Sequence, residues 1–327
     1  MKIFKIILGI LLVIMALFGF TYLVDNAKPM AWEITNTSNK NGISWARFEW
    51  TNGVISGKPF KRTSISIPCK IKELPNVFTF QFDLGARYTG IYENSFSSFY
   101  ATNPSIKQIN KRMKSPIQFW NKGKIYENLS IYFGDYKAYN SLSYVYGNFG
   151  EKIEINSKNV NDTIHLGTIG ADLFYDKVLI IDYPNERFAI CEQVPDVYKN
   201  NLIDIKITNK GYIILPMKIR NNLYEILFDT GSSIFPIITK AKNINNYSTL
   251  PDTDTIKISS WGKMHDVTGR IIKDTFELAG QKFTNVKVYA NHSGLGIDNQ
   301  TDGMTGNALF WDKTVIIDFK NKKFGVK

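Results

Sequence analysis

Two short stretches of this chain place an aspartate directly after a hydrophobic strand and before a turn of small residues. Residues 83–86 read Asp-Leu-Gly-Ala, and residues 229–232 read Asp-Thr-Gly-Ser. Two carboxylates held about 3 Å apart cannot both ionise easily, so they share one proton and one pKa rises. The ionised partner can then accept a proton from water while the protonated partner polarises a carbonyl group. The pattern therefore indicates hydrolysis by an activated water, if the two aspartates meet.

Similar elements precede both aspartates. Residues 67–72 read Ile-Pro-Cys-Lys-Ile-Lys, and residues 215–220 read Leu-Pro-Met-Lys-Ile-Arg. We expect each to form a strand, followed by a polar turn and a second strand that ends at the aspartate. The first turn is two residues longer, which a surface connection tolerates.

A longer repeat follows each aspartate. Residues 170–190 align with residues 306–326 without a gap over 21 residues. Each copy starts with a glycine and predicts a short helix and two strands around an asparagine-centred turn. Repetition of this length indicates a duplicated unit. We therefore predict two similar lobes that meet near residue 200 about an approximate two-fold axis, each contributing one Asp-x-Gly loop.

These motifs resemble the active-site loops of the pepsin-like aspartic peptidases, a bilobal family related to the retropepsins. The resemblance covers roughly residues 60–327 and leaves residues 100–140 unmatched. It implies a mostly β fold with two pseudo-symmetric lobes, and catalytic roles for Asp83 and Asp229 in peptide-bond hydrolysis. Substrate-binding or loop-supporting roles are implied for Gly85, Thr230, Gly231, Ser232, Tyr146 and Gly147.

The hydroxyl of Ser232 can donate a hydrogen bond to the Asp229 carboxylate, whereas Ala86 cannot do this for Asp83. A hydrogen bond to the charged form lowers a carboxyl pKa. We therefore expect Asp229 to be the ionised partner and Asp83 the protonated one.

A hairpin with a glycine-rich tip is expected over residues 144–155, where the family carries its flap. A tyrosine beside a glycine covers the substrate in that family, and Tyr146-Gly147 matches this pattern best. An edge hairpin with an inward-packed aromatic side chain explains the pattern equally well. Residues 260–262, Ser-Trp-Gly, are the counterpart in the second half.

Leu84 departs from the family pattern. The family has Thr or Ser at this position, and that hydroxyl reaches the backbone of the other loop, which leucine cannot do. Thr230 keeps the hydroxyl in the second loop. The alternative to an active peptidase is therefore a catalytically degenerate bilobal domain that binds peptide or has a structural role.

The N-terminus carries an apolar run over residues 6–23 that follows Lys2 and Lys5. This length is borderline for a membrane-spanning helix, and no small-x-small cleavage site follows it. We expect an uncleaved anchor rather than a cleaved signal, with the globular part on the periplasmic or extracellular side of a bacterial membrane. The predicted division is anchor or signal 1–25, stalk 26–42, N-terminal β lobe 43–200 and C-terminal β lobe 201–327.

Composition narrows the remaining possibilities. The net charge of +11 comes from scattered lysines, which favours a compositional bias over an anionic partner. No basic stripe or nucleic-acid motif is present, and the histidines lack metal-ligand spacing. Residues 106–113 have helical spacing with a basic face. We expect a monomer without metal or cofactor, whose partners are a peptide or protein substrate and, through its N-terminus, the membrane.

Overall fold

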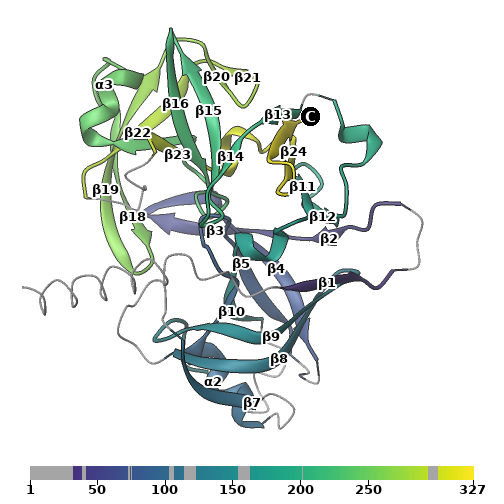
Figure 1. Ribbon diagram of the computed structural model, residues 1–327. Coiled ribbons are helices and arrows are strands. Elements are labelled where there is room, and N and C mark those ends of the chain that lie inside the picture. Colours follow the sequence, from purple (N-terminus) through teal and green to yellow (C-terminus); the bar gives the residue numbers. More distant parts are fainter. Residues whose placement is uncertain are drawn as a thin grey trace, which may run out of the picture.

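The computed structural model describes residues 32–38, 42–72, 74, 76–102, 107–113, 123–153, 163–200, 202–293 and 301–327. Within these ranges the chain is mostly β, as predicted, and its strands form three sheets (Figure 1). No helix among these residues is long and apolar enough to cross a bilayer. The predicted anchor at residues 6–23 lies outside the described residues.

The first sheet comes from the N-terminal half. In the described part of the chain it has nine strands, in the order β1-β9-β6-β10-β5-β4-β8-β7, with β3 paired to β4. Their bounds are β1 (Glu33–Asn36), β3 (Glu49–Ile55), β4 (Lys58–Ile71), β5 (Phe78–Phe82), β6 (Gly90–Tyr92), β7 (Lys107–Met113), β8 (Gly123–Phe133), β9 (Tyr136–Tyr146) and β10 (Ile164–Ile169). Helix α2 (Glu93–Thr102) follows β6. Alternate residues of β4 from Ile65 to Ile71 are buried, which is the strand period of two with one face in the core.

Two N-terminal segments differ from the sequence-based expectation. The helical spacing of residues 106–113 is misleading, because residues 107–113 form β7 and pair antiparallel with β8. Hydrogen bonding to a neighbouring strand overrides a local period. In addition, β1 lies inside the predicted stalk and pairs antiparallel with β9, so this part of the stalk belongs to the sheet.

The second sheet comes from the C-terminal half. Its ten strands, counted over the described residues, follow the order β18-β19-β22-β17-β23-β16-β15-β20-β21, with β14 paired to β15. Their bounds are β14 (Lys206–Ile207), β15 (Ile213–Ile219), β16 (Asn222–Phe228), β17 (Ile237–Lys240), β18 (Asp254–Ser260), β19 (Lys263–Ile272), β20 (Phe276–Leu278), β21 (Gln281–Phe283), β22 (Val286–Asn291) and β23 (Gly303–Thr305). Two short helices, η3 (Ala241–Asn243) and α3 (Ile244–Tyr247), follow β17.

The two sheets repeat the same strand pairings. In the first, β5 is parallel to β10, and β6 is antiparallel to β10 and parallel to β9. In the second, β16 is parallel to β23, and β17 is antiparallel to β23 and parallel to β22. The hairpin β7–β8 then corresponds to β18–β19, because β8 pairs with β9 as β19 pairs with β22. The described parts of residues 100–140 thus have a counterpart in topology, although not in sequence.

The third sheet combines both halves. Across the described residues its order is β13-β25-β24-β11-β12-β2. The bounds are β2 (Ala46–Arg47), β11 (Val178–Asp182), β12 (Arg187–Cys191), β13 (Leu202–Asp204), β24 (Thr314–Asp318) and β25 (Lys323–Val326), with the 3-10 helices η1 (Ala171–Phe174), η2 (Asp196–Tyr198) and η4 (Asn307–Leu309) nearby. The repeat aligned from sequence therefore forms equivalent elements, a 3-10 helix and a strand pair, in each half.

The contact between β11 and β24 shows the two-fold relationship. These strands are antiparallel, and Ile180 pairs with Ile316, its equivalent in the repeat. Exchanging the halves leaves this register unchanged. Core packing repeats as well, since Phe82 lies 5.6 Å from Phe174 and Phe228 lies 5.7 Å from Phe310 between ring centroids. Each pair links the strand before an aspartate to the short helix of its own half.

Candidate active site

Both predicted aspartates lie just beyond the end of a strand that runs parallel to a neighbour. The N–H of Asp83 donates to the carbonyl of Ile169 at 3.0 Å, and the N–H of Asp229 donates to that of Thr305 at 2.9 Å. The aspartates thus occupy equivalent positions at the carboxyl ends of paired strands, where side chains meet at one sheet edge.

A glycine follows each of these acceptor residues. A Cβ atom would lie 2.7 Å from the carbonyl oxygen of Ala86 at Gly170, and 1.4 Å from that of Ser232 at Gly306. Only a residue without a side chain permits such a close approach of the backbones. The glycines that open the two repeats are therefore required by the packing of the aspartate loops.

The two aspartate loops face each other. A Cβ atom at Gly85 would lie 2.4 Å from the carboxyl carbon of Asp229, and one at Gly231 would lie 2.8 Å from that of Asp83. A hydrogen bond joins the two carboxyl groups. The structure thus brings together two aspartates that are far apart in the sequence, and each glycine leaves room for the opposite carboxyl group.

Backbone N–H groups hold the carboxyl groups in place. The N–H groups of Gly231 and Gly85 donate to Oδ1 of Asp229 at 2.7 and 3.0 Å. The N–H of Ala86 donates to Oδ1 of Asp83 at 2.9 Å. Because Gly85 belongs to the other loop, its bond to Asp229 fixes the loops relative to each other.

Burial and mutual interaction shift the titration of the pair. Burial raises the pKa of Asp83, and both the charge of Asp229 and the hydrogen bond to it raise this pKa further, to well above its usual range. Burial also raises the pKa of Asp229, but the hydrogen bonds from Asp83, Gly231 and Gly85 oppose that rise. Two backbone N–H groups donate to Asp229 and favour its charged form, so we expect Asp83 to hold the shared proton.

Ser232 does not make the predicted contact. Within the described residues its Oγ has no hydrogen-bond partner, although its N–H donates to the carbonyl of Asp229 at 3.0 Å. The reason given from sequence for an ionised Asp229, a hydrogen bond from the Ser232 hydroxyl, is therefore wrong. Backbone N–H groups hold the Asp229 carboxylate, and every residue type except proline carries such a group.

The hydroxyl of Thr230, in the second loop, hydrogen-bonds to the backbone of the first loop. Oγ1 of Thr230 accepts a hydrogen bond from the N–H of Leu84 at 2.9 Å and donates one to the carbonyl of Phe82 at 3.0 Å. The Leu84 side chain is fully buried in the main core. As predicted, the apolar side chain of Leu84 cannot make the equivalent hydrogen bonds to the backbone of the second loop.

Asn307 supports the second loop in another way, and sequence reasoning missed it. Its Nδ2 donates to the carbonyl of Thr230 and to Oγ of Ser233, both at 2.7 Å. Its Oδ1 accepts a hydrogen bond from the hydroxyl of Tyr183 at 2.7 Å. The available signal was Asn307 itself, since the equivalent position in the first repeat is Ala171.

The carboxyl pair borders a cleft of about 400 Å³ between the two halves. The N-terminal half contributes a polar edge and two aromatic side chains, and the C-terminal half contributes apolar side chains interspersed with serines. Representative lining residues are Gln81, Tyr92, Phe149, Phe235, Ile258 and Met304. A cleft that combines apolar side chains with convergent polar groups is typical of a binding site.

The hairpin β18–β19 borders this cleft with its tip. Trp261, at the tip, lies 5.3 Å from the ring of Tyr146 and 5.5 Å from that of Phe149 between centroids. The predicted flap tip at Tyr146-Gly147 does not join two strands within the described residues, which omit residues 154–162. Tyr146 is the last residue of β9 and is buried, and its hydroxyl donates to the carbonyl of Tyr88. The described residues 151–153 that follow do not form a strand.

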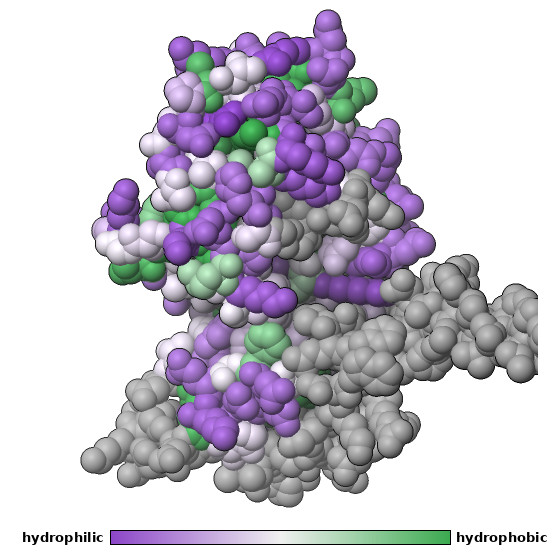
Figure 2. Space-filling view, turned by 90° about the vertical axis from the view of Figure 1, so that its left-hand side faces the viewer, coloured by the Kyte–Doolittle hydropathy of each residue, from purple (hydrophilic) through white to green (hydrophobic). Residues whose placement is uncertain are grey.

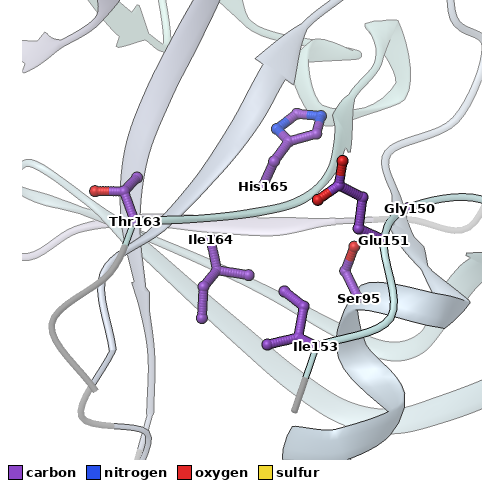
Figure 3. A pocket seen from close by; sticks show the side chains of 7 residues that line it. All are labelled: Ser95, Gly150, Glu151, Ile153, Thr163, Ile164 and His165. Carbon is purple, nitrogen blue, oxygen red and sulfur yellow. The ribbon is translucent and has the colours of Figure 1, made fainter. Parts of the chain in front are cut away.

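A separate cavity of about 370 Å³ lies in the N-terminal half (Figure 3). Figure 3 shows Ser95, Glu151 and His165 on the same side of this cavity, the residue types of a hydrolytic triad. In the described part of the chain, however, the Ser95 hydroxyl has no hydrogen-bond partner, so no base holds it. Burial lowers the pKa of His165 against the opposing charge of Glu151. This cavity therefore lacks the geometry of an activated nucleophile.

Comparison with known proteins adds little to this geometry. No protein-family model matches the chain, and no curated protein matches it. Among solved structures, the chain is similar to an aspartic proteinase from Irpex lacteus, with a TM-score of 0.47 and 10% sequence identity over 81% of this chain and 94% of that one. We therefore base the functional proposal on the contacts of the chain itself.

Proposed function

We propose that this protein is an aspartic endopeptidase that hydrolyses peptide bonds with Asp83 and Asp229. The observation that carries the proposal is the hydrogen-bonded pair of buried carboxyl groups, one from each half, at the cleft between them. Two such carboxyls with one shared proton supply both an acid and a base near each other. The cleft offers both apolar side chains and polar groups, which suits an extended peptide.

The two aspartates divide the work according to their protonation. Asp229, the ionised partner, accepts a proton from a water molecule as that water attacks the scissile carbonyl carbon. Asp83 donates its proton toward the carbonyl oxygen, which gives a tetrahedral diol. When the C–N bond breaks, the leaving amine takes a proton from the pair and one diol hydroxyl loses one, so the shared proton is restored.

A second candidate function is a catalytically degenerate domain that binds peptide in the same cleft. Leu84 favours this candidate, because it leaves the interloop brace with one hydroxyl instead of two. The retained carboxyl pair and the Asn307 contacts favour the active enzyme. Both candidates predict peptide binding, and only the first predicts turnover.

We also propose that residues 6–23 anchor the protein in a membrane, with the globular part outside the cytoplasm and no nucleic-acid partner. The support is the length of the apolar run and the lysines that precede it. Deleting residues 1–25 should release a soluble protein. A mature protein that is already soluble and starts after residue 23 would instead identify a cleaved signal.

The deciding experiment is cleavage of a peptide library from acidic to neutral pH, with and without a statine-type transition-state inhibitor. We expect inhibitor-sensitive cleavage by the wild type. Asp83→Asn and Asp229→Asn should each abolish turnover while the circular dichroism spectrum stays unchanged. Full activity in either variant would exclude the proposed pair, and inhibitor binding without turnover would favour the degenerate domain.

A further inference from the structure

Among the described residues β18 is an edge strand, and the edge that does not pair with β19 borders the cleft. It is the terminal strand of the C-terminal sheet and pairs with β19 through a two-residue turn, closed by Ser260 and Lys263. In an antiparallel hairpin, hydrogen-bonded and non-hydrogen-bonded pairs alternate. The backbone groups of Ser260 and Ile258 therefore point toward β19. Those of Ser259 and Lys257 point outward.

One contact shows this outward direction directly. The N–H of Lys257 donates to Oγ of Ser56 at 2.8 Å, and the same Oγ lies 3.5 Å from the Lys257 carbonyl. Ser56 sits at the tip of the hairpin β3–β4, which extends from the N-terminal half to β18 (Figure 1). Ile55 and Phe60 of that hairpin pack against the apolar cluster of the C-terminal half. The hairpin thus occupies the β18 edge at Lys257.

Ser259, two residues further along the edge, is in a different position. It lines the same cleft as the carboxyl pair, and it is exposed. Because strand period is two, its N–H and C=O face the same side as those of Lys257, which leaves them directed at the cleft. Exposed N–H and C=O groups of this kind are a template for another extended chain.

The tip of this hairpin places an aromatic side chain at the rim of the cleft. Trp261 and Gly262 have φ values of +49° and +76°, and a two-residue hairpin turn of type I′ has positive φ at both central residues. A bulky residue at the first of these positions is uncommon. The Trp261 side chain is 38% exposed and lines the cleft beside Ser259. Figure 2 shows the face on which β18 and β19 lie, where hydrophobic residues are scattered among hydrophilic ones.

We propose that the β18 edge at Ser259 is the docking strand for an extended peptide, whose backbone pairs with the Ser259 N–H and C=O. Trp261 lies over the adjacent peptide side chain, and the hairpin β3–β4 ends the pairing at Lys257. The peptide class rests on the proposed function, whereas the docking itself does not require turnover. Backbone pairing at a sheet edge is a general mode of peptide recognition.

Proline substitution at the edge tests this inference. Ser259→Pro removes an outward N–H and leaves the β18–β19 ladder intact, since edge positions tolerate proline when their N–H faces outward. Thr255→Pro is the matched control, because Thr255 has the same orientation on the same strand but does not line the cleft. The ligand is a peptide with a statine unit at the scissile position, and calorimetry measures its affinity.

We expect Ser259→Pro to weaken binding about tenfold, the effect of one lost backbone hydrogen bond, while Thr255→Pro binds like the wild type. Equal affinities for both variants, or a wild type that binds no peptide, would overturn the inference. If Ser259→Pro does not fold, disulfide trapping replaces it. Ser259→Cys should trap a peptide that carries a cysteine at one register position, and Thr255→Cys should trap none.

The outcome separates this inference from the proposed function. Peptide binding that depends on Ser259 without any cleavage would support docking and reject the peptidase. Cleavage that depends on both aspartates but not on Ser259 would support the peptidase and reject docking at this edge.

Discussion

The N–H of Leu84 donates to Oγ1 of Thr230 at 2.9 Å, and Leu84 has no hydroxyl with which to brace Thr230 in return. The two aspartate loops are therefore held by an asymmetric contact in an otherwise two-fold arrangement. Asn307 lies on the side that lacks the brace and bonds the carbonyl of Thr230. The two halves thus differ at two positions. Leu84 stands opposite Thr230 in the loops, and Asn307 stands where the first repeat has Ala171.

The first prediction concerns Leu84→Thr. A hydroxyl at this position should reach the backbone of the second loop and raise kcat, while the smaller side chain should lower the free energy of unfolding by about 1–3 kcal/mol. Turnover of a library-derived substrate and urea unfolding measure the two effects. Leu84→Val is the matched control, because valine has the shape of threonine without the hydroxyl. Equal kcat values for the threonine and valine variants would show that the brace does not limit catalysis.

The second prediction concerns Asn307. Asn307→Ala leaves the Thr230 carbonyl, the Ser233 hydroxyl and the Tyr183 hydroxyl without this partner. Each buried polar group left unpaired costs about 1–3 kcal/mol, so we expect a large loss in the urea midpoint together with reduced turnover. Tyr183→Phe removes one of the three bonds and should cost about 1 kcal/mol with turnover kept. A larger loss for Tyr183→Phe would contradict a central role for Asn307.

The duplicated elements could be predicted from the sequence because each half carries its own Asp-x-Gly motif and its own copy of the 21-residue repeat. The register of Ile180 with Ile316 follows from that duplication, as does the placement of Asp83 and Asp229 at the ends of equivalent strands. Glycine at residues 85 and 231 was informative because a close approach excludes every side chain.

Other features depended on contacts that no local pattern encodes. Residues 107–113 have a helical period but form a strand because β8 lies beside them. Tyr146 looked like a flap residue because a glycine follows it, yet the aromatic residue at a hairpin tip beside the cleft is Trp261. The bond between Ser56 and Lys257 joins hairpins 201 positions apart, which a local pattern cannot anticipate.

The third prediction concerns Ser232→Ala. Because the Ser232 Oγ has no partner among the described residues, its removal should leave the lower apparent pKa of the pH profile of kcat/KM unchanged. The pair titrates as a unit, and the N–H groups of Gly85 and Gly231 hold the ionised carboxylate in the variant as in the wild type. A rise in that pKa would show that the hydroxyl turns toward Asp229 in solution.

The last prediction concerns Asp172, a buried carboxyl in the first helix of the repeat. Its Oδ1 accepts hydrogen bonds from the N–H and hydroxyl of Thr89 at 2.6 and 2.7 Å, and its Oδ2 accepts one from Nε1 of Trp32 at 3.2 Å. Burial nevertheless raises its pKa to about 7, with these bonds opposing the rise.

The carboxyl group of an unfolded aspartate has a pKa of about 4. Between about pH 4 and about pH 7 the folded protein therefore binds one more proton, at Asp172, than the unfolded protein. The contribution of Asp172 to stability is therefore full below this window and is lost as the pH rises through it. In Asp172→Asn the unfolding free energy should fall less with pH across the window than in the wild type. Trp32→Phe removes one of the hydrogen bonds that lower this pKa, so its unfolding free energy should still fall with pH and the fall should extend to a higher pH than in the wild type. Urea midpoints measured across the window give these slopes, and parallel slopes for Asp172→Asn and the wild type would show that Asp172 is ionised throughout.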